Sequence, residues 1–137
     1  MNAITVETTI NAPVSKVWEK WTTPEDIMGW NFASSDRECP AAINELKEGG
    51  RLLRTMAAKD GSMSFDFEGS YDAIVPLQSI NYTIADGRKV SLVFESIDEE
   101  TTKLTETFDP EETNPEELQR GGRQAILDNF KDYVENN

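Results

Sequence analysis

Apolar and polar residues alternate along most of this chain, the pattern of strands that are buried on one face. The alternation is clearest over residues 63–75, where one apolar face would run as far as Val75. Similar runs, rich in β-branched residues and bounded by turn residues, predict the remaining strands. These are residues 4–10, 51–58, 79–85, 89–97 and 102–108, with a short strand within 39–46.

Turn signals separate the later strands. Asp60-Gly61 and Asp86-Gly87 are typical two-residue hairpin turns, Pro76 ends the longest strand, and the acidic residues 98–100 form another turn. Strands joined by such short connections pair antiparallel. Residues 51–108 are therefore predicted to form an antiparallel meander.

Two short helices are predicted between the first two strands. The first follows Pro13, and its apolar positions share one face. The second begins at Thr23-Pro24, with Thr23 as the N-cap, and ends near Gly29. The apolar face of the first helix carries Val14, Val17, Trp18 and Trp21.

A long helix closes the chain. An acidic linker over residues 109–117 leads into Asn114-Pro115, where Asn114 would be the N-cap and Glu117 would close a capping box. The helix is predicted to continue to about Glu135. Its apolar stripe consists of Ile126, Leu127, Phe130, Tyr133 and Val134.

The predicted order is one strand, two short helices, six strands and a long helix. This is an α+β architecture: a curved antiparallel sheet of six to seven strands has one apolar face to cover, and the long C-terminal helix can lie across it. A curved sheet around a single helix leaves space between them. A length of 137 residues fits one domain, residues 1–137.

Charge and composition limit the possible partners. The net charge is −13, from 26 acidic and 13 basic residues, which argues against nucleic acid and anionic membranes. No apolar run is long enough to span a bilayer, and residues 1–10 do not resemble a secretory signal. We therefore expect a cytoplasmic protein without membrane insertion, as a monomer or a homodimer.

The sequence has no histidine, and Cys39 is its only cysteine. These counts exclude Ser-His-Asp and Cys-His nucleophile systems, and they exclude a zinc site made of cysteine and histidine. Glycine motifs that bind phosphate are also missing. We predict no catalytic constellation, no metal site and no cofactor.

Several motifs together resemble a known family. They are residues 4–6 and 10–13, Val17-Trp18, Thr23-Pro24-Glu25, Trp30, Gly121-Gly122 and residues 125–131. In these motifs the chain resembles the START-like, or SRPBCC, superfamily, and within it the bacterial homologues of the Hsp90 ATPase activator. One position departs from the family's pattern: Arg123 follows the helix glycines where a tryptophan is usual.

The resemblance implies a Bet v 1-like helix-grip fold with a deep cavity between the sheet and the C-terminal helix. Members of the superfamily bind lipids, sterols, polyketides and other apolar molecules, and some catalyse cyclisation or hydrolysis. Eukaryotic activators of this branch bind the Hsp90 chaperone. For the present chain these properties are expectations.

Ten residues are candidates for the lining of such a cavity. Six are aromatic residues, for each of which core packing is the alternative interpretation. The other four lie on one stripe of the long helix, where Arg123 would reach an anionic or carbonyl group of a ligand, extend to solvent or pair with an acid of the linker. The candidates are Trp30, Phe65, Phe67, Tyr71, Tyr82, Phe94, Gln119, Arg123, Ile126 and Phe130.

Glu106 shares a strand face with Leu104 and Phe108. On a concave face its carboxyl group would be a buried acid or base; the outward orientation, as a surface charge, is the one we expect. No two residues have a spacing that indicates a catalytic pair.

The leading hypothesis is thus a non-enzymatic protein that binds an apolar small molecule. The alternatives are a module that binds a chaperone or another protein, and a small hydrolase or cyclase that uses the same cavity.

Overall fold

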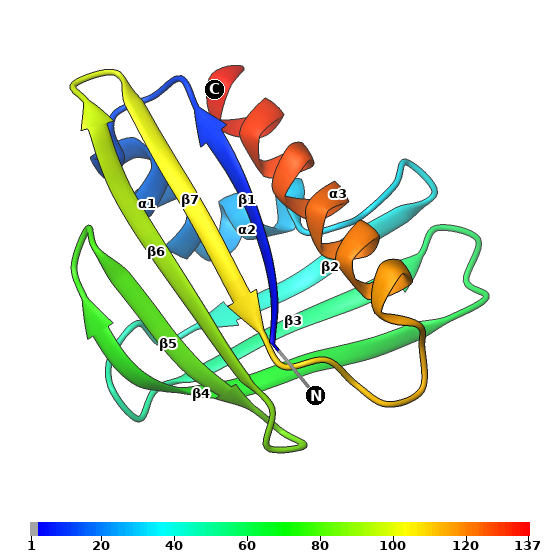
Figure 1. Ribbon diagram of the computed structural model, residues 1–137. Helices are drawn as coiled ribbons and strands as arrows, with labels where there is room; N and C mark the ends of the chain where they lie inside the picture. Colours follow the sequence, from blue (N-terminus) through cyan, green and yellow to red (C-terminus); the bar gives the residue numbers. More distant parts are fainter. Residues whose placement is uncertain (1–2) are drawn as a thin grey trace.

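The computed structural model describes residues 3–137, and its seven strands form one antiparallel sheet in the order β1-β7-β6-β5-β4-β3-β2 (Figure 1). The sheet confirms the predicted meander, and the first strand joins it beside the last. The strands are β1 (Ile4–Ile10), β2 (Arg37–Asn44), β3 (Arg51–Ala58), β4 (Ser64–Val75), β5 (Ser79–Ile84), β6 (Lys89–Asp98) and β7 (Thr101–Phe108). Gly61 and Gly87, at the two predicted hairpin turns, have φ angles of +80° and +94°.

The three predicted helices are α1 (Val14–Thr22), α2 (Pro24–Trp30) and α3 (Glu116–Glu135). Their predicted side-chain caps are wrong. Thr23 is at the N-cap of α2 but makes no capping hydrogen bond, and α3 begins one residue late, with Pro115 at its N-cap. Asn114 does not cap the helix; its backbone and side-chain N–H groups both donate to Glu111 Oε1, which ties it to the linker.

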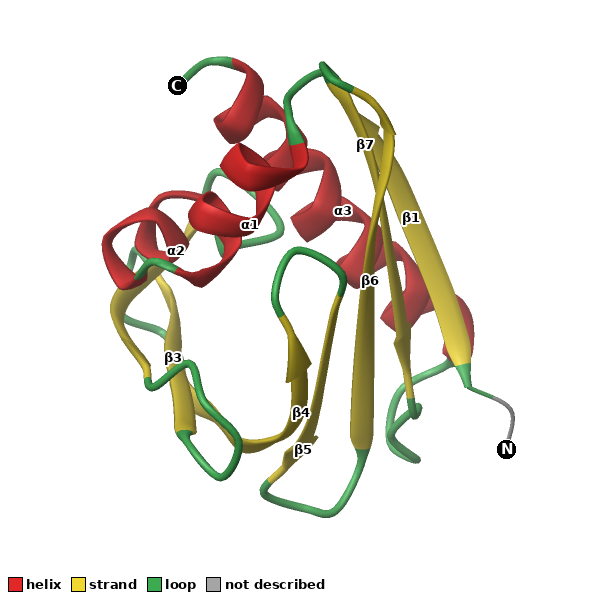
Figure 2. Ribbon diagram, turned by 90° about the vertical axis from the view of Figure 1, so that its left-hand side faces the viewer, coloured by secondary structure: helices red, strands yellow, loops and turns green. Residues whose placement is uncertain are grey.

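The sheet curls around α3, and α1 and α2 close one end of the curl (Figures 1 and 2). In Figure 2, β3 and β1 stand on opposite sides of the interior, with β4 and β5 between them. This is the helix-grip arrangement. No helix within residues 3–137 combines the length and the apolar character that crossing a bilayer requires.

Strand β4 departs from the predicted alternation. Its pairing with β5 shifts between Tyr71 and Ala73, which places an extra residue in β4. Beyond this bulge Ile74 packs against the core, whereas Val75 is 44% exposed. The predicted apolar face therefore does not continue to Val75, because one inserted residue moves every later side chain to the opposite face.

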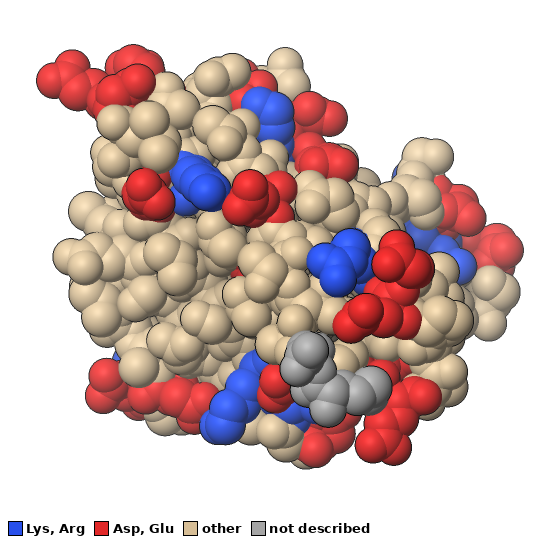
Figure 3. Space-filling view, in the orientation of Figure 1, with Lys and Arg blue, Asp and Glu red and all other residues tan. Residues whose placement is uncertain are grey.

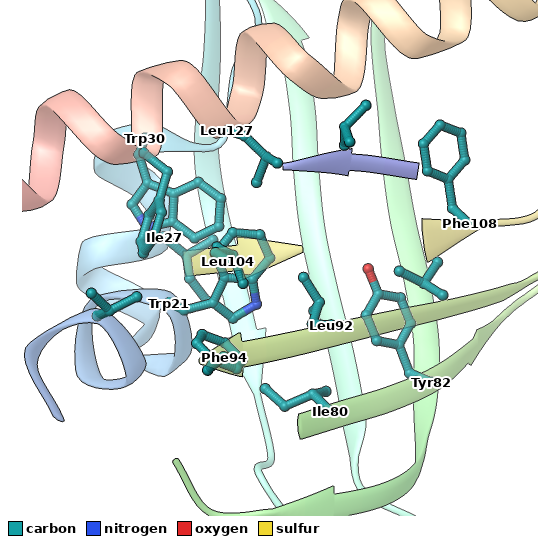
Figure 4. Close-up of a cluster of buried hydrophobic side chains, with 14 of the residues drawn as sticks. Trp21, Ile27, Trp30, Ile80, Tyr82, Leu92, Phe94, Leu104, Phe108 and Leu127 are labelled. Atoms are coloured by element: carbon teal, nitrogen blue, oxygen red, sulfur yellow. The ribbon is translucent and has the colours of Figure 1, made fainter. Parts of the chain in front are cut away.

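An aromatic cluster fills the interior beside α1 and α2 (Figure 4). The rings of Trp21 and Trp30 stack with their centroids 4.5 Å apart. Phe130, from the C-terminal half of α3, packs edge-on against both indoles at 4.9 and 4.8 Å. Trp30 and Phe130 are fully buried, so this end of the molecule is closely packed.

Candidate functional site

A cavity of about 300 Å³ lies between the sheet and the N-terminal half of α3. Its walls come from β3, β4, β7, the segment after α2, and the linker between β7 and α3. Most of its side chains are apolar or aromatic, and a few are charged. The lining residues are Trp21, Asn31, Ala33, Arg54, Met56, Phe65, Phe67, Arg88, Glu106, Phe108, Glu111, Asn114, Leu118, Gln119, Gly122, Arg123 and Ile126.

Hydrogen bonds hold the segment after α2 in place as one wall. The Asn129 side chain of α3 donates to the backbone carbonyl of Trp30 at 2.9 Å. The indole N–H of Trp30 in turn donates to the carbonyl of Lys20 at 2.9 Å. Asn31 and Ala33, which line the cavity, follow directly after this anchored residue. The wall is thus tied to both α1 and α3.

Glu106 and Arg123 form a buried ion pair at the cavity wall. Arg123 Nη1 donates to Glu106 Oε2 at 2.8 Å, and the side chain of Glu106 is only 5% exposed. Both expectations for these residues are wrong: Glu106 faces inward, and Arg123 extends neither to solvent nor to an acid of the linker. Glu106 lies between Val6 of β1 and Leu92 of β6, where an unpaired carboxylate would be costly.

The guanidinium of Arg123 also packs on two aromatic rings. Its central carbon lies 4.5 Å from the ring centroid of Phe108 and 5.3 Å from that of Phe67. Although burial opposes the charge, the Glu106 carboxylate holds the pKa of Arg123 above its usual value. Arg123 is thus fixed by one carboxylate and two rings.

Arg54 is the second arginine of the interior, on the inner face of β3. It is only 6% exposed, and its guanidinium carbon lies 5.5 Å and 5.4 Å from the ring centroids of Trp21 and Trp30. No ion pair within residues 3–137 includes Arg54. Its buried Nε–H has no acceptor among the same residues. Arg54 is therefore a buried cation stacked on indoles without a counter-ion.

Comparison with known proteins identifies the family. The family described as "Activator of Hsp90 ATPase homolog 1-like protein", AHSA1, matches residues 11–135. The chain belongs to the AHSA1 family. The predicted resemblance and the helix-grip fold are thereby confirmed. Among curated proteins, none matches the chain.

Solved structures of AHSA1-like proteins have the same fold. The AHSA1-like protein from Aeromonas hydrophila is 38% identical, with a TM-score of 0.87 over 97% of this chain and 93% of that one. Chr148 from Cytophaga hutchinsonii is 56% identical, with a TM-score of 0.85 over 99% and 94% of the two chains. Protein NE0264 from Nitrosomonas europaea is only 13% identical, with a TM-score of 0.83 over 98% and 95%, and shows the fold alone.

The ten candidate residues divide into two groups in this AHSA1 fold. Half of them line the cavity: Phe65, Phe67, Gln119, Arg123 and Ile126. The other half belong to the buried core: Trp30, Tyr71, Tyr82, Phe94 and Phe130. Whether the first group contacts a ligand remains a prediction.

Gln119 lines the cavity, but its amide group is already engaged. Its Nε2 donates to the carbonyls of Glu111 and Asn114 at 3.1 and 2.8 Å, and its Oε1 accepts from the backbone N–H of Glu111 at 2.9 Å. These bonds tie the linker to the first turn of α3. Gln119 therefore shapes the mouth of the cavity and has little capacity left for a ligand.

The sequence interpretation missed Arg54, Trp21, Phe108 and Gly122 as cavity residues. For Arg54 a signal was available. It lies on the same face of β3 as Leu52, which is fully buried, and Met56, which lines the cavity. A charged residue in the apolar register of a strand indicates an inward charge. Gly122 had no such signal, since a missing side chain leaves no pattern.

The site offers no metal ligands in the described part of the chain. Within residues 3–137, no group of three His, Cys, Asp or Glu side chains is placed to hold a metal ion. Cys39 is buried, and burial raises the pKa of its thiol, so at neutral pH it is a neutral thiol. The chemistry of the site is therefore that of aromatic surfaces, three guanidinium groups and two carboxylates.

Proposed function

We propose that this protein binds an apolar small molecule in the cavity between the sheet and the N-terminal half of α3. The observation that carries the proposal is the cavity itself, about 300 Å³ beneath a helix that is otherwise closely packed. Ligand sites in proteins are concave and mostly apolar, with a few polar groups that orient the ligand. Phe65, Phe67, Phe108 and Ile126 supply the apolar walls.

The size of the cavity limits the ligand. A water molecule takes up about 30 Å³ in the liquid, so the cavity has room for about ten non-hydrogen atoms. A ligand of this size corresponds to one aromatic ring with a short chain. Larger molecules such as sterols would extend beyond the cavity.

Binding is favoured over catalysis by the state of the one inward carboxyl group in the cavity wall. Glu106 is paired with Arg123 at 2.8 Å, so its carboxylate already has a partner within the wall. The cavity has neither histidine nor cysteine in its lining. A hydrolase or cyclase would have to use Glu106 after separating it from Arg123.

The test uses two adjacent glycines of α3. A Cβ atom added at Gly122, which lines the cavity, or at Gly121, which is exposed, would meet nothing within 4 Å. Gly122→Leu would fill part of the cavity, and Gly121→Leu is the matched control. Leucine favours the helix over glycine by roughly 0.5–1 kcal/mol at either position, so both variants should unfold at slightly higher temperature.

Ligands are sought by thermal shift and by NMR titration with aromatic and aliphatic amides, alcohols and acids of eight to fourteen non-hydrogen atoms. Binding to the folded state raises the melting temperature, and the stabilisation grows as RT ln(1 + L/Kd), where L is the concentration of free ligand. We expect Gly122→Leu to abolish the response to a bound compound, and Gly121→Leu to retain it. The proposal is wrong if no compound binds, or if both variants bind equally well.

A second candidate function, binding of an Hsp90-type chaperone, is supported by the family description and by one surface. Figure 3 shows a broad area over β5 to β7 without charged side chains, in a protein of net charge −13. Its outward side chains include Ser91, Val93, Thr105 and Thr107.

The test of this second function is the ATPase rate of a bacterial Hsp90 with and without this protein. A Val93→Lys variant should lose any stimulation, and an unchanged rate with wild type would exclude this function.

A further inference from the structure

Arg54 carries a buried charge that nothing in the described chain neutralises. Taking a guanidinium out of water is unfavourable unless it is paired, and buried arginines are accordingly almost always found with carboxylates. Residues 3–137 contain no ion pair to Arg54, and its Nε–H lacks an acceptor. Stacking on Trp21 and Trp30 offsets only part of this cost.

The neighbouring titratable groups do not supply the missing negative charge. The charge of Arg54 acts on Cys39, Tyr71 and Tyr82, but burial raises the pKa of each of these three groups, so all of them are neutral at pH 7. The inward carboxylate, Glu106, is paired with Arg123.

The other charged residues of the cavity wall also have partners. Arg88 pairs with Asp86 at 2.7 Å, and Glu111 at the mouth accepts the backbone N–H of Asn114 at 2.9 Å. The wall contains three arginines against two glutamates, although the protein as a whole is strongly acidic. Arg54 is thus the cation of this cavity for which the described chain provides no acceptor.

We propose that Arg54 is the anchor for the carboxylate of an amphipathic acid, whose apolar part occupies the aromatic cavity. This inference rests on the proposed binding function and adds the chemical class of the ligand. Arg54 lines the cavity together with Trp21, so its side chain borders the space that a ligand would occupy. The ligand carboxylate would pair with Arg54 in the same way that Glu106 pairs with Arg123.

A carboxylate fits this site better than other anions. A guanidinium presents a planar fork of N–H donors that matches the two oxygens of a carboxylate. One unpaired cation balances one negative charge, whereas a phosphate monoester carries close to two at pH 7. The remaining walls, Met56, Phe67, Phe108 and Ile126, are apolar and suit a ring or a short hydrocarbon chain.

The experiment compares 3-phenylpropanoate with 3-phenylpropanamide, two compounds with eleven non-hydrogen atoms that differ in charge, close to the estimated capacity of the cavity. Binding to wild-type protein is measured by isothermal titration calorimetry and by NMR. Hydrogen bonds to a charged group lead us to expect that the acid binds roughly ten- to a hundredfold more tightly than the amide. In Arg54→Met this ratio should fall to about one.

Arg51→Met is the matched control, since Arg51 lies on the same strand, loses the same charge and is exposed beside Glu68, away from the cavity. It should keep the wild-type ratio. If Arg54→Met does not fold, Arg54→Lys retains the charge without the fork and should keep a reduced preference for the acid. The comparison of the two compounds on wild type needs no variant.

The outcomes separate this inference from the proposed function. Equal binding of the acid and the amide, both abolished by Gly122→Leu, would refute the role of Arg54 and leave the binding cavity in place. A preference for the acid that survives in Arg54→Met would also refute it. If neither compound binds at millimolar concentration and the wider compound set fails too, both proposals are wrong.

Discussion

The two halves of α3 cover the same sheet in different ways. In the C-terminal half, Leu127, Phe130 and Val134 are fully buried against the sheet and the short helices. In the N-terminal half, Leu118 is 63% exposed, and Gln119 and Arg123 project polar groups over a cavity. The short helices reach only one end of the curl (Figure 2), and the cavity lies beneath the other half of α3.

If the proposed binding function holds, this difference separates stability from recognition within one helix. Close packing of large aromatic side chains provides most of the free energy of folding at the end beside α1 and α2. The open end contributes less, because fewer of its side chains are fully buried. Trp21 belongs to both parts, because it stacks on Trp30 and also lines the cavity.

The largest expected effect comes from truncating one side chain in each half. Phe130→Ala should lower the free energy of unfolding by about 3–5 kcal/mol, because it removes a fully buried ring and leaves a void among the indoles. Ile126→Ala, which only enlarges an existing cavity, should cost about 1 kcal/mol. Urea denaturation monitored by tryptophan fluorescence measures both. Equal losses would mean that the two halves are packed alike.

The buried ion pair gives an intermediate effect at the open end. Glu106→Gln should destabilise the protein by roughly 1–3 kcal/mol, because it leaves the guanidinium of Arg123 without its counter-ion; the 21% exposure of Arg123 limits the loss. The double variant Glu106→Leu, Arg123→Met should be more stable than Glu106→Gln alone. A double-mutant cycle of Glu106→Leu, Arg123→Met and their double variant, by urea denaturation, measures the coupling energy of the pair. Additive effects of the two single substitutions would argue against the pair.

Much of the fold could be predicted because its signals are local. Alternation and turn residues defined the strands, and proline and the apolar stripe defined the helices. The failures depend on atoms that the pattern does not describe. Asn114 has a good capping residue type, but its N–H groups donate to Glu111. In β4, one inserted residue near Tyr71 reversed the orientation of Val75.

The cavity was harder to predict than the fold, because the core and the cavity share one face of the sheet. Parity along a strand places Phe67 and Tyr82 both inside, yet Phe67 lines the cavity and Tyr82 lies in the core. The ring centroids of these two residues lie only 6.3 Å apart, so neither parity nor position along the strand separates a cavity residue from a core residue. Glu106 was expected to face outward because of its charge, although it shares a strand face with the buried residues Leu104 and Phe108.

The smallest expected effect on stability is the loss of one hydroxyl group from either of two tyrosines that are paired across β4 and β5. Tyr71 donates its hydroxyl hydrogen to Asn44 Oδ1, and Asn44 donates to the carbonyl of Thr22 in α1 at 2.6 Å. The hydroxyl of Tyr82 points up from the sheet toward α3, where Arg123 is its neighbour, but it makes no well-formed hydrogen bond within residues 3–137 (Figure 4). Tyr71→Phe should therefore cost about 1 kcal/mol and Tyr82→Phe close to none.

Alkaline pH extends this comparison. Burial above all raises the pKa of Tyr71 to about 12 in the folded protein, against the ordinary value of 10 when unfolded. The folded state keeps a proton that the unfolded state releases, so this stabilisation is complete below pH 10 and is lost as the pH rises toward 12. Tyr82 and Tyr133, whose pKa values are also raised, act in the same direction.

Between pH 10 and 12, Tyr71→Phe should lose stability less steeply than wild type in urea denaturation. Equal slopes would mean that the Tyr71 hydroxyl is accessible to water, and that the closed end is less tightly packed than the C-terminal half of α3 indicates.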